Sequence, residues 1–167
     1  MSVAKRVVLL AIVFTTCLGC DQVTKSVAKD TLVSSHPVSL LRGFINLQYT
    51  ENSGLMLGIG SGLPHSIRFW LFTVVVGGIT LGLLWFVLAS STLGTNSSIA
   101  LTLVAAGACG NILDRIFKGN VVIDFVTVGF GDVRTAVFNV ADVAILCGIT
   151  LFLFFHGRSL TGQGTKL

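Results

Sequence analysis

Four long apolar segments dominate the chain. They cover approximately residues 5–25, 69–89, 93–113 and 135–155, and the second contains no charged residue. A helix needs roughly 20 mostly apolar residues to cross the hydrocarbon core of a bilayer. The pattern therefore predicts four transmembrane helices.

The segment between the first two predicted helices, residues 26–68, is too long for a simple turn. Apolar and polar residues alternate along Phe44–Tyr49, and four glycines follow between residues 54 and 62. The alternation favours β-strands, and the glycines permit tight bends. We therefore predict an all-α integral membrane protein with four transmembrane helices and a small β-rich cap over residues 26–68 that lies on the membrane surface. All of residues 1–167 form one membrane-embedded domain in this prediction.

The composition agrees with a membrane protein. Of 167 residues, 53% are hydrophobic and only 11% are charged, which is far too apolar for an ordinary soluble domain. The net charge of +4 comes from Lys and Arg residues that are scattered singly, whereas nucleic-acid-binding segments concentrate them in blocks. We therefore expect no nucleic-acid partner, and we expect contact with anionic membrane lipid.

Polar residues gather at one end of three of the predicted helices. They are Asp21 and Lys25 in the first, Asn111, Asp114 and Arg115 in the third, and Asn139 and Asp142 in the fourth. On an alternating up-and-down path, these three ends lie on the same side of the membrane. Ionisable residues at membrane depth are costly and usually functional, so we predict a site at one membrane face. The distribution of basic residues leaves open which face this is.

Two of the polar motifs have a functional and a purely structural interpretation. Asp21 and Lys25 have the i,i+4 spacing of a helical ion pair, although Lys25 could instead anchor the helix end at the membrane interface. Asn52 and Gly54 line the site in one interpretation and form only a turn in the other, because both residue types favour turns.

The third apolar segment carries a stripe of small and polar residues. Gly107, Gly110, Asn111 and Asp114 are spaced so that they share one helical face. Glycines on such a face let another helix approach closely, and Asn can hydrogen-bond across the contact. Arg115 adjoins the stripe, and we expect Asp114 and Arg115 to form an ion pair that supports the site.

Neither Asp124 nor Asp142 has a basic residue three or four positions away. Asp124 lies in an apolar run that we expect to be a flexible connection after Gly119, and Asp142 lies at the start of the fourth helix. A carboxylate in apolar surroundings has a raised pKa, and two such groups brought together share a proton. Aspartic proteases need this state, in which one carboxylate activates water and the other donates to the scissile carbonyl. The alternative is that these are two unrelated interfacial aspartates.

Other catalytic chemistries fit less well. His36, His65 and His156 are dispersed and no H-E-x-x-H motif occurs, so we expect no metal or cofactor. No Gly-x-Ser-x-Gly nucleophile motif is present. The cysteines also lack metal-ligand spacing, and we predict that they are small core residues. They are Cys17, Cys20, Cys109 and Cys147.

Taken together, these motifs resemble the lipoprotein signal peptidase family, the type II signal peptidases of bacteria. Each motif alone is weak, but five of them occur in the family's order across nearly the whole chain. They are Asp21-Gln-x-Thr-Lys25, Asn52-x-Gly54, Gly110-Asn-x-x-Asp-Arg115, Val122-Ile-Asp-Phe125 and Phe138-Asn-x-Ala-Asp142.

Two positions depart from the family's pattern. Leu57 precedes Gly58 where the family commonly has Phe, and Ala106 precedes Gly107 where it often has Gly. Both departures concern packing or substrate fit more than chemistry, so they bear on specificity.

The resemblance implies an aspartic endopeptidase of the bacterial inner membrane, with both termini cytoplasmic and the active site at the outer face. Its implied substrate is a diacylglyceryl-modified prolipoprotein, cut before the lipidated cysteine, and its implied inhibitor is globomycin. The catalytic pair carried over by motif is Asp124 and Asp142. The residues carried over as supporting or substrate-binding are Asp21, Lys25, Asn52, Gly54, Asn111, Asp114, Arg115 and Asn139. The main alternative function is a small transporter or channel with acidic residues on an ion path; a non-catalytic scaffold is another.

Overall fold

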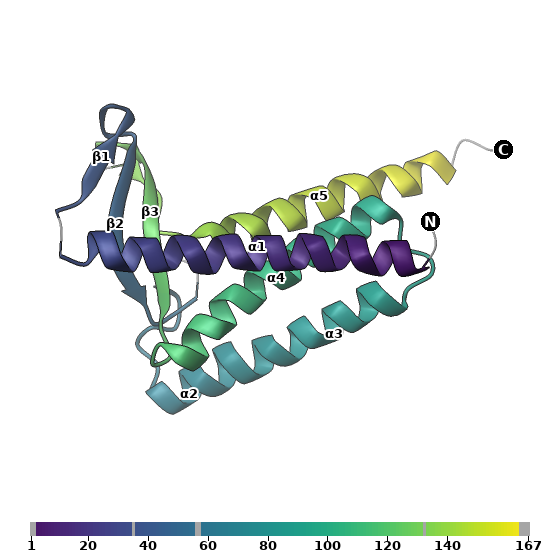
Figure 1. Ribbon diagram of the computed structural model, residues 1–167, viewed down its shortest axis with the longest axis horizontal. Helices are drawn as coiled ribbons and strands as arrows, with labels where there is room; N and C mark the ends of the chain where they lie inside the picture. Colours follow the sequence, from purple (N-terminus) through teal and green to yellow (C-terminus); the bar gives the residue numbers. More distant parts are fainter. Residues whose placement is uncertain (1–2, 35, 56–57, 132, 164–167) are drawn as a thin grey trace.

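The computed structural model describes residues 3–34, 36–55, 58–131 and 133–163, with side chains as far as residue 155 (Figure 1). The predicted departure at Leu57 lies outside these residues. Helices and strands follow in the order α1 (Val3–Leu32), β1 (Val38–Leu40), β2 (Ile45–Asn52), α2 (His65–Phe69), α3 (Val76–Ala89), α4 (Thr95–Phe117), β3 (Val122–Phe130), β4 (Val133–Arg134) and α5 (Val140–Gln163). A short 3-10 turn, Leu41–Gly43, joins β1 to β2, and a π-helical stretch, Trp70–Val75, joins α2 to α3.

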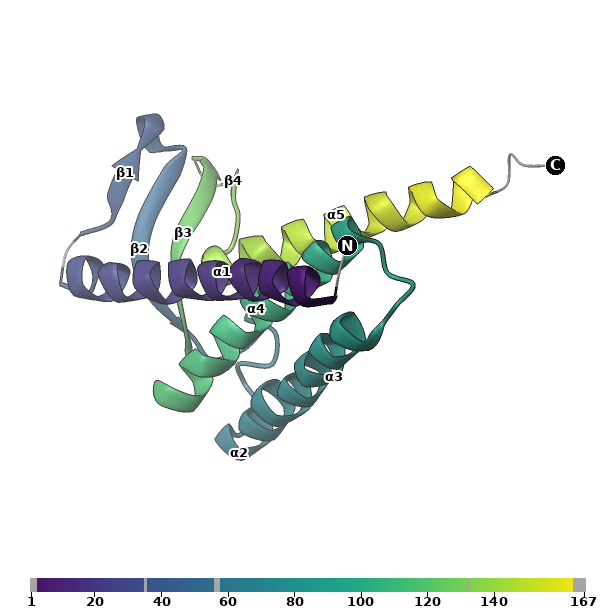
Figure 2. The ribbon, with the colours of Figure 1, turned by 45° about the vertical axis from the view of Figure 1, so that its right-hand side comes forward.

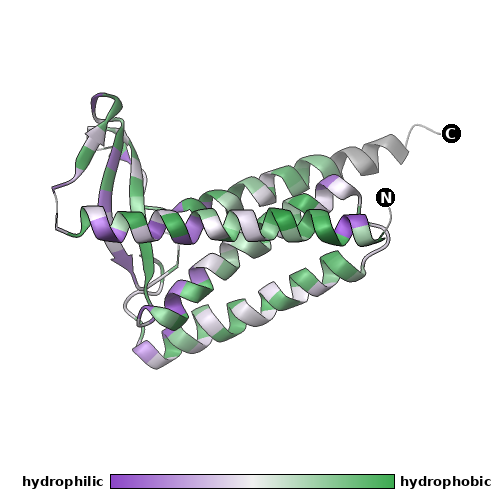
Figure 3. Cartoon of the chain, in the orientation of Figure 1, coloured by the Kyte–Doolittle hydropathy of each residue, from purple (hydrophilic) through white to green (hydrophobic). Residues whose placement is uncertain are grey.

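Among the described residues, three helices are long and apolar enough to cross a membrane, and a fourth is shorter. The long ones are α1, the continuous helix His65–Ala89 and α4, and the shorter apolar helix is Val140–Phe155 of α5. Figure 3 shows hydrophobic residues along these helices and hydrophilic ones gathered toward the sheet. Exposed side chains such as Leu81 and Trp85 cover the outer face of α3, as expected for a surface that meets lipid.

The boundaries of two predicted helices are wrong. α1 continues to Leu32, so the first part of the predicted cap is helical. α5 begins at Val140 rather than at residue 135. The residues before it are extended because they add to the sheet: the Phe138 N–H donates to the Val126 carbonyl at 2.8 Å.

A four-stranded antiparallel sheet lies across one end of the helices (Figures 1 and 2), in the order β1-β2-β3-β4. Its central pair joins distant parts of the chain, since Ile45 of β2 pairs with Val128 and Asn52 pairs with Val122 of β3. The prediction of an all-α chain with a cap confined to residues 26–68 is therefore too simple. The protein is mostly helical, and half of its sheet comes from the connection between the last two predicted helices.

The turn between α4 and β3 explains how that connection becomes a strand. Gly119 and Asn120 have φ values of +72° and +66°, in the left-handed region that ends many helices. The Asn120 N–H donates to the Arg115 carbonyl at 2.9 Å. The following residues, Val122 and Ile123, are 3% and 1% exposed, so β3 is held by burial as well as by pairing.

Helix α4 packs against α1, α3 and α5, and small residues make these contacts close. A Cβ at Gly107 would collide with the Ala141 carbonyl of α5, and one at Gly110 would collide with the Asp21 carboxylate of α1. Ala106, the second predicted departure, is fully buried. In lipid, where all helix surfaces are equally apolar, such close approach gives the packing energy that holds helices together. The predicted packing face of the third helix is confirmed.

The prediction that the cysteines are core residues is wrong for two of them. All four are free thiols, but Cys20 and Cys147 are exposed, and Cys17 and Cys109 are only partly buried. The thiols of Cys20 and Cys147 lie on outward surfaces of their helices, where a small apolar side chain is as compatible with lipid as with a protein core.

Candidate active site

A buried ammonium group joins α1 to α4 at the end of the bundle nearest the sheet. Lys25 is 0% exposed, and its Nζ lies 2.8 Å from Asp21 Oδ2 and 3.0 Å from Asp114 Oδ2. It also donates to Asn111 Oδ1 at 2.9 Å. The predicted Asp21–Lys25 ion pair is confirmed, and the alternative of an interfacial anchor is wrong because the amine is buried among partners.

Asp21 extends this network to a third helix. Its second carboxylate oxygen accepts a hydrogen bond from the Ala141 N–H at 2.9 Å, in the first turn of α5. The unpaired N–H groups and the helix dipole favour a negative charge at that position. The Asp21 carboxylate therefore has two effects. Through Lys25 it positions α1 against α4, and through the Ala141 N–H it fixes where α5 begins.

Asp114 and Arg115 do not form the predicted ion pair. Asp114 lies within 2.7 Å of Lys118 Nζ and accepts a hydrogen bond from the Ile123 N–H at 3.1 Å. Successive helical residues project about 100° apart, so Arg115 points elsewhere. Lys118 was not among the predicted site residues. Its spacing of four residues from Asp114 is nevertheless the same signal that identified the Asp21–Lys25 pair.

Arg115 instead supports the turn that follows β2. Its Nη2 donates to the Gly54 carbonyl at 2.8 Å, and its Nη1 donates to the Asn111 carbonyl at 3.2 Å. The guanidinium also lies 5.9 Å from the centre of the Phe72 ring. A Cβ at Gly54 would meet the Ile59 carbonyl at 2.6 Å, so glycine is needed there for the backbone to pack closely.

Asp124 is 2% exposed and lies on β3, within the sheet. The expectation that a flexible connection carries it is therefore wrong. Its carboxylate accepts hydrogen bonds from Asn139 Nδ2 at 2.6 Å and from Asn52 Nδ2 at 2.9 Å. Asn52 Oδ1 accepts from the Gly54 N–H at 2.9 Å, so Asn52 forms a turn and contacts the site at once.

Asp142 is held at the first turn of α5 by reciprocal hydrogen bonds with Asn139. The Asn139 N–H donates to the Asp142 carboxylate at 3.2 Å, and the Asp142 N–H donates to Asn139 Oδ1 at 3.0 Å. This is the arrangement of a capping box, with Asp in place of the usual Glu. Asn111 Nδ2 also donates to Asp142 Oδ1 at 2.9 Å, so the carboxylate is fixed from two helices.

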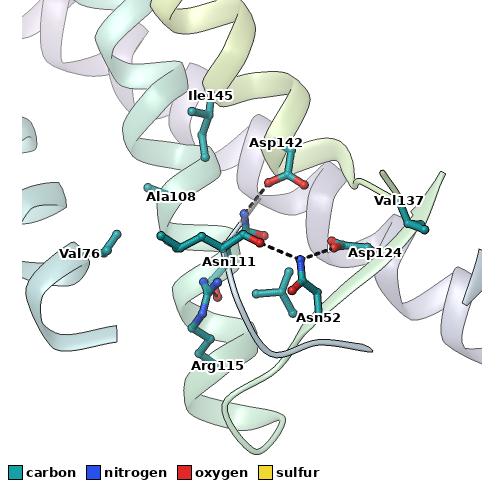
Figure 4. Close-up of a pocket in the computed structure, with 11 residues that line it drawn as sticks. Asn52, Val76, Ala108, Asn111, Arg115, Asp124, Val137, Asp142 and Ile145 are labelled. Carbon is teal, nitrogen blue, oxygen red and sulfur yellow. Dashed lines mark hydrogen bonds between the residues drawn. The ribbon is translucent and has the colours of Figure 1, made fainter. Parts of the chain in front are cut away.

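Both aspartates line one cavity of about 270 Å³ between the helices and the sheet (Figure 4). Val76, Ala108 and Ile145 form an apolar wall on the helical side of this cavity. The other predicted site residues that line it are Asn52, Asn111 and Arg115. Asp21, Lys25, Gly54, Asp114 and Asn139 do not line it. Lys25, Gly54 and Asn139 contact residues that do, and Asp21 and Asp114 are connected to the site through Lys25.

The pKa of Asp124 is raised from 3.8 to about 6. Burial is the main cause, and the nearby charge of Asp142 raises it further, while the hydrogen bonds from Asn52 and Asn139 oppose the shift. Asp124 is therefore the carboxyl that keeps its proton more readily than an ordinary aspartate. No cluster of three or more potential metal ligands occurs among the described residues.

A pair of coupled carboxylates on one cavity, at the polar end of a bundle of apolar helices, defines a membrane-embedded aspartic peptidase. Comparison with known proteins identifies the family. The family model described as "Signal peptidase (SPase) II" matches residues 13–157. The chain belongs to this family, the lipoprotein signal peptidases, which are aspartic peptidases that cleave the signal peptides of prolipoproteins. Membership of an enzyme family argues against the transporter, channel and scaffold alternatives.

Individual relatives support this assignment. The chain is 32% identical over 150 residues to the lipoprotein signal peptidase of Desulforapulum autotrophicum, covering 90% of this chain and 92% of that one. It is 36% identical over 145 residues to that of Xanthomonas campestris pv. campestris, covering 84% and 85%. A solved bacterial membrane enzyme has the same fold, with a TM-score of 0.81 at 24% identity over 95% of this chain and 93% of that one.

Replacing Lys25 by Met should destabilise the fold, because it removes the cation that contacts two buried carboxylates. Breaking a fully buried ion pair costs about 3–5 kcal/mol. The measurement is thermal unfolding of the purified protein in detergent, with Lys29→Met as the matched control, since Lys29 lies one turn later in α1 and is exposed. Equal unfolding temperatures for the two variants would contradict the structural role given to Lys25.

Proposed function

We propose that this chain cuts diacylglyceryl-modified prolipoproteins immediately before the lipidated cysteine, with Asp124 and Asp142 as the catalytic pair. The observation that carries this proposal is that both carboxylates line one cavity with an apolar wall on its helical side. A substrate anchored by a signal peptide and acyl chains presents its scissile bond at the membrane surface. The cavity lies at that level, between the apolar helices and the sheet.

In the proposed mechanism the two aspartates share one proton. Asp142, which accepts hydrogen bonds from Asn111 and from the Asn139 backbone, acts as the base and takes a proton from the attacking water. Asp124, with its raised pKa, is the acid and donates its proton to the scissile carbonyl, which gives a tetrahedral gem-diol with no covalent enzyme intermediate. Asp142 then gives its proton to the amide nitrogen of the cysteine, a gem-diol hydroxyl returns a proton to Asp124, and the C–N bond breaks to release the signal peptide with a new carboxyl end.

The remaining site residues act by position rather than by touching the scissile bond. Asn111 and Asn139 orient the two carboxylates, and Asn52 holds Asp124 from the turn that Gly54 and Arg115 support. The buried pairs that Lys25 makes with Asp21 and Asp114 fix the helices that carry these groups. Globomycin is the inhibitor that the family resemblance implies, and it should compete with substrate for this cavity.

We further propose that the protein lies in the bacterial inner membrane with the sheet at the outer face and both termini in the cytoplasm. Figures 1 and 2 support one part of this proposal: the start of α1 and the far end of α5 both lie on the side of the bundle away from the sheet, so α1 begins and α5 ends on the same side. Membrane lipid would surround the apolar helices, and the prolipoprotein would reach the cavity from within the bilayer.

Asp124→Asn and Asp142→Asn should each abolish cleavage, and the double variant should be hardly worse. Each group supplies general acid–base catalysis worth about 10²–10⁴-fold, and groups that act as a unit lose activity non-additively. The measurement is a gel shift of a purified prolipoprotein, with and without globomycin. All three variants should remain folded and membrane-inserted, and substantial cleavage by either single variant would rule out the paired-aspartate mechanism.

The rate of cleavage should depend on pH with a bell-shaped profile whose alkaline limb lies near pH 6. Above the raised pKa of Asp124, about 6, the pair loses its shared proton and with it the acid; at low pH the pair takes up a second proton and the base is lost. The measurement is kcat/KM from pH 4 to pH 9. A rate that stays constant from pH 5 to pH 8 would contradict the assigned roles.

The same shift predicts a change in folding stability. The folded state binds the Asp124 proton more tightly than the unfolded state does. The stabilisation of the folded state by this proton is fully present below about pH 3.8 and is lost as pH rises through about 6. The Asp124→Asn variant has no carboxyl at this position and does not lose this stabilisation. Its free energy of unfolding relative to that of the wild type should therefore increase between pH 4 and pH 7. If the free energies of unfolding of the variant and the wild type changed in parallel across this range, burial of Asp124 would have no such effect on stability.

The orientation predicts where an impermeant thiol reagent can react. In a background without the four native cysteines, a cysteine introduced at Ser61, on the sheet side of the membrane, should be labelled in intact spheroplasts. The matched control is a cysteine at Thr92, in the turn between α3 and α4 at the opposite end, which should react only after lysis. The reverse pattern would invert the topology.

A further inference from the structure

A second cavity, of about 230 Å³, adjoins the active site on the side of the sheet. It shares Asn52, Asp124 and Val137 with the first cavity. Its other lining residues come from the end of β2, the loop after it and the segment before α5, and they are Thr50, Glu51, Ser53, Gly58, Ser61 and Ala136. None of its lining residues lies on an α-helix, so this cavity lies outside the bundle, next to the end that carries Asp142.

The two cavities differ in the chemistry of their walls. Val76, Ala108 and Ile145 of the first come from three apolar helices. The hydroxyl groups of Thr50, Ser53 and Ser61 and the Glu51 carboxylate line the second, beside Asn52, Asp124, Ala136 and Val137. A peptide that crosses Asp124 from one cavity to the other therefore passes from a wall of apolar helices to a more polar wall, which matches a substrate whose signal peptide is apolar and whose mature part is polar.

We propose that the second cavity binds the residues that follow the lipidated cysteine, and that Glu51 there favours a basic side chain over an acidic one. This inference rests on the proposed function and extends it to substrate specificity. A cavity of this volume accommodates about one or two side chains. The peptide would enter it directly after passing the hydrogen bond between Asn52 and Asp124.

Glu51 is placed to meet such a side chain. It is exposed, and the Tyr49 hydroxyl donates to its Oε1 at 2.8 Å, which fixes the carboxylate and leaves its other oxygen to a substrate. Burial, and then the Glu51 carboxylate, raise the pKa of Tyr49 to about 12, so this hydroxyl stays a donor throughout the working pH range. Among the described residues, Glu51 has no cation within ion-pair distance.

Arg68 lies beside the cavity and is directed to its wall. Its Nη1 lies 3.4 Å from the Ser53 carbonyl and 3.5 Å from the Ser61 carbonyl. The charged side chains among the residues that line the second cavity are Glu51 and, when it is ionised, Asp124. Both are negative, so a Lys or Arg on the peptide is attracted and a Glu or Asp is repelled.

The test compares prolipoproteins that differ only in the two residues after the lipidated cysteine, carrying Lys, Gln or Glu there. With the wild type, kcat/KM should be about two- to fivefold higher for the Lys substrate than for the Glu substrate, as expected for an exposed charge pair. The preference should shrink at high salt. Glu51→Gln should remove it, and Glu51→Lys should reverse it.

The matched control is Asp30→Asn, which removes an exposed carboxylate of α1 that lines neither cavity; the wild-type preference should persist. Thermal unfolding establishes that each Glu51 variant is folded. If both Glu51 variants rank the substrates as the wild type does, or if the wild type itself has no preference, the role of Glu51 is refuted. Failure of the wild type to cleave any of the substrates would instead overturn the proposed function, and this inference with it.

Discussion

The structure depends on the buried ammonium group of Lys25. Lys25 is fully removed from solvent, and such a charge is tolerated only when opposite charges and hydrogen-bond acceptors surround it. Asp21 supplies one partner from its own helix, and Asp114 and Asn111 supply the others from α4. Helices α1 and α4 can satisfy this ammonium in only one register. The contact of Asp21 with the Ala141 N–H then brings the start of α5 to the same place.

The same network sets the direction of the hydrogen bonds at the aspartates. An amide side chain has one acceptor end and one donor end. Because Asn111 Oδ1 accepts from Lys25, its Nδ2 is the end that faces Asp142. Asn139 likewise uses its oxygen to cap α5 and its nitrogen to reach Asp124. The charged groups of Asp21, Lys25 and Asp114 do not line the active-site cavity. They nevertheless determine which amide groups contact Asp124 and Asp142.

The position of the site follows from the junction of two kinds of structure. Helices supply Asn111 and Asp142, and the sheet supplies Asn52 and Asp124, so the cavity lies where the bundle and the sheet meet. In the function proposed above, the apolar helical wall would bind the membrane-anchored part of the substrate, and the cavity beside the sheet would bind the part that leaves the membrane.

The sequence by itself determined the apolar helices, the convergence of their polar ends and the Asp21–Lys25 pair, because these depend on local periodicity and on spacings within one helix. It also identified Asp124 and Asp142 as candidates, since both lie in apolar stretches without a basic residue three or four positions away and both fall in motifs of a known family. Only the tertiary structure decided that β2 pairs with β3, and that Arg115 contacts a carbonyl rather than Asp114. The physical reason is that strand pairing and the partners of long side chains depend on segments far apart in the chain, which meet only when the helices pack.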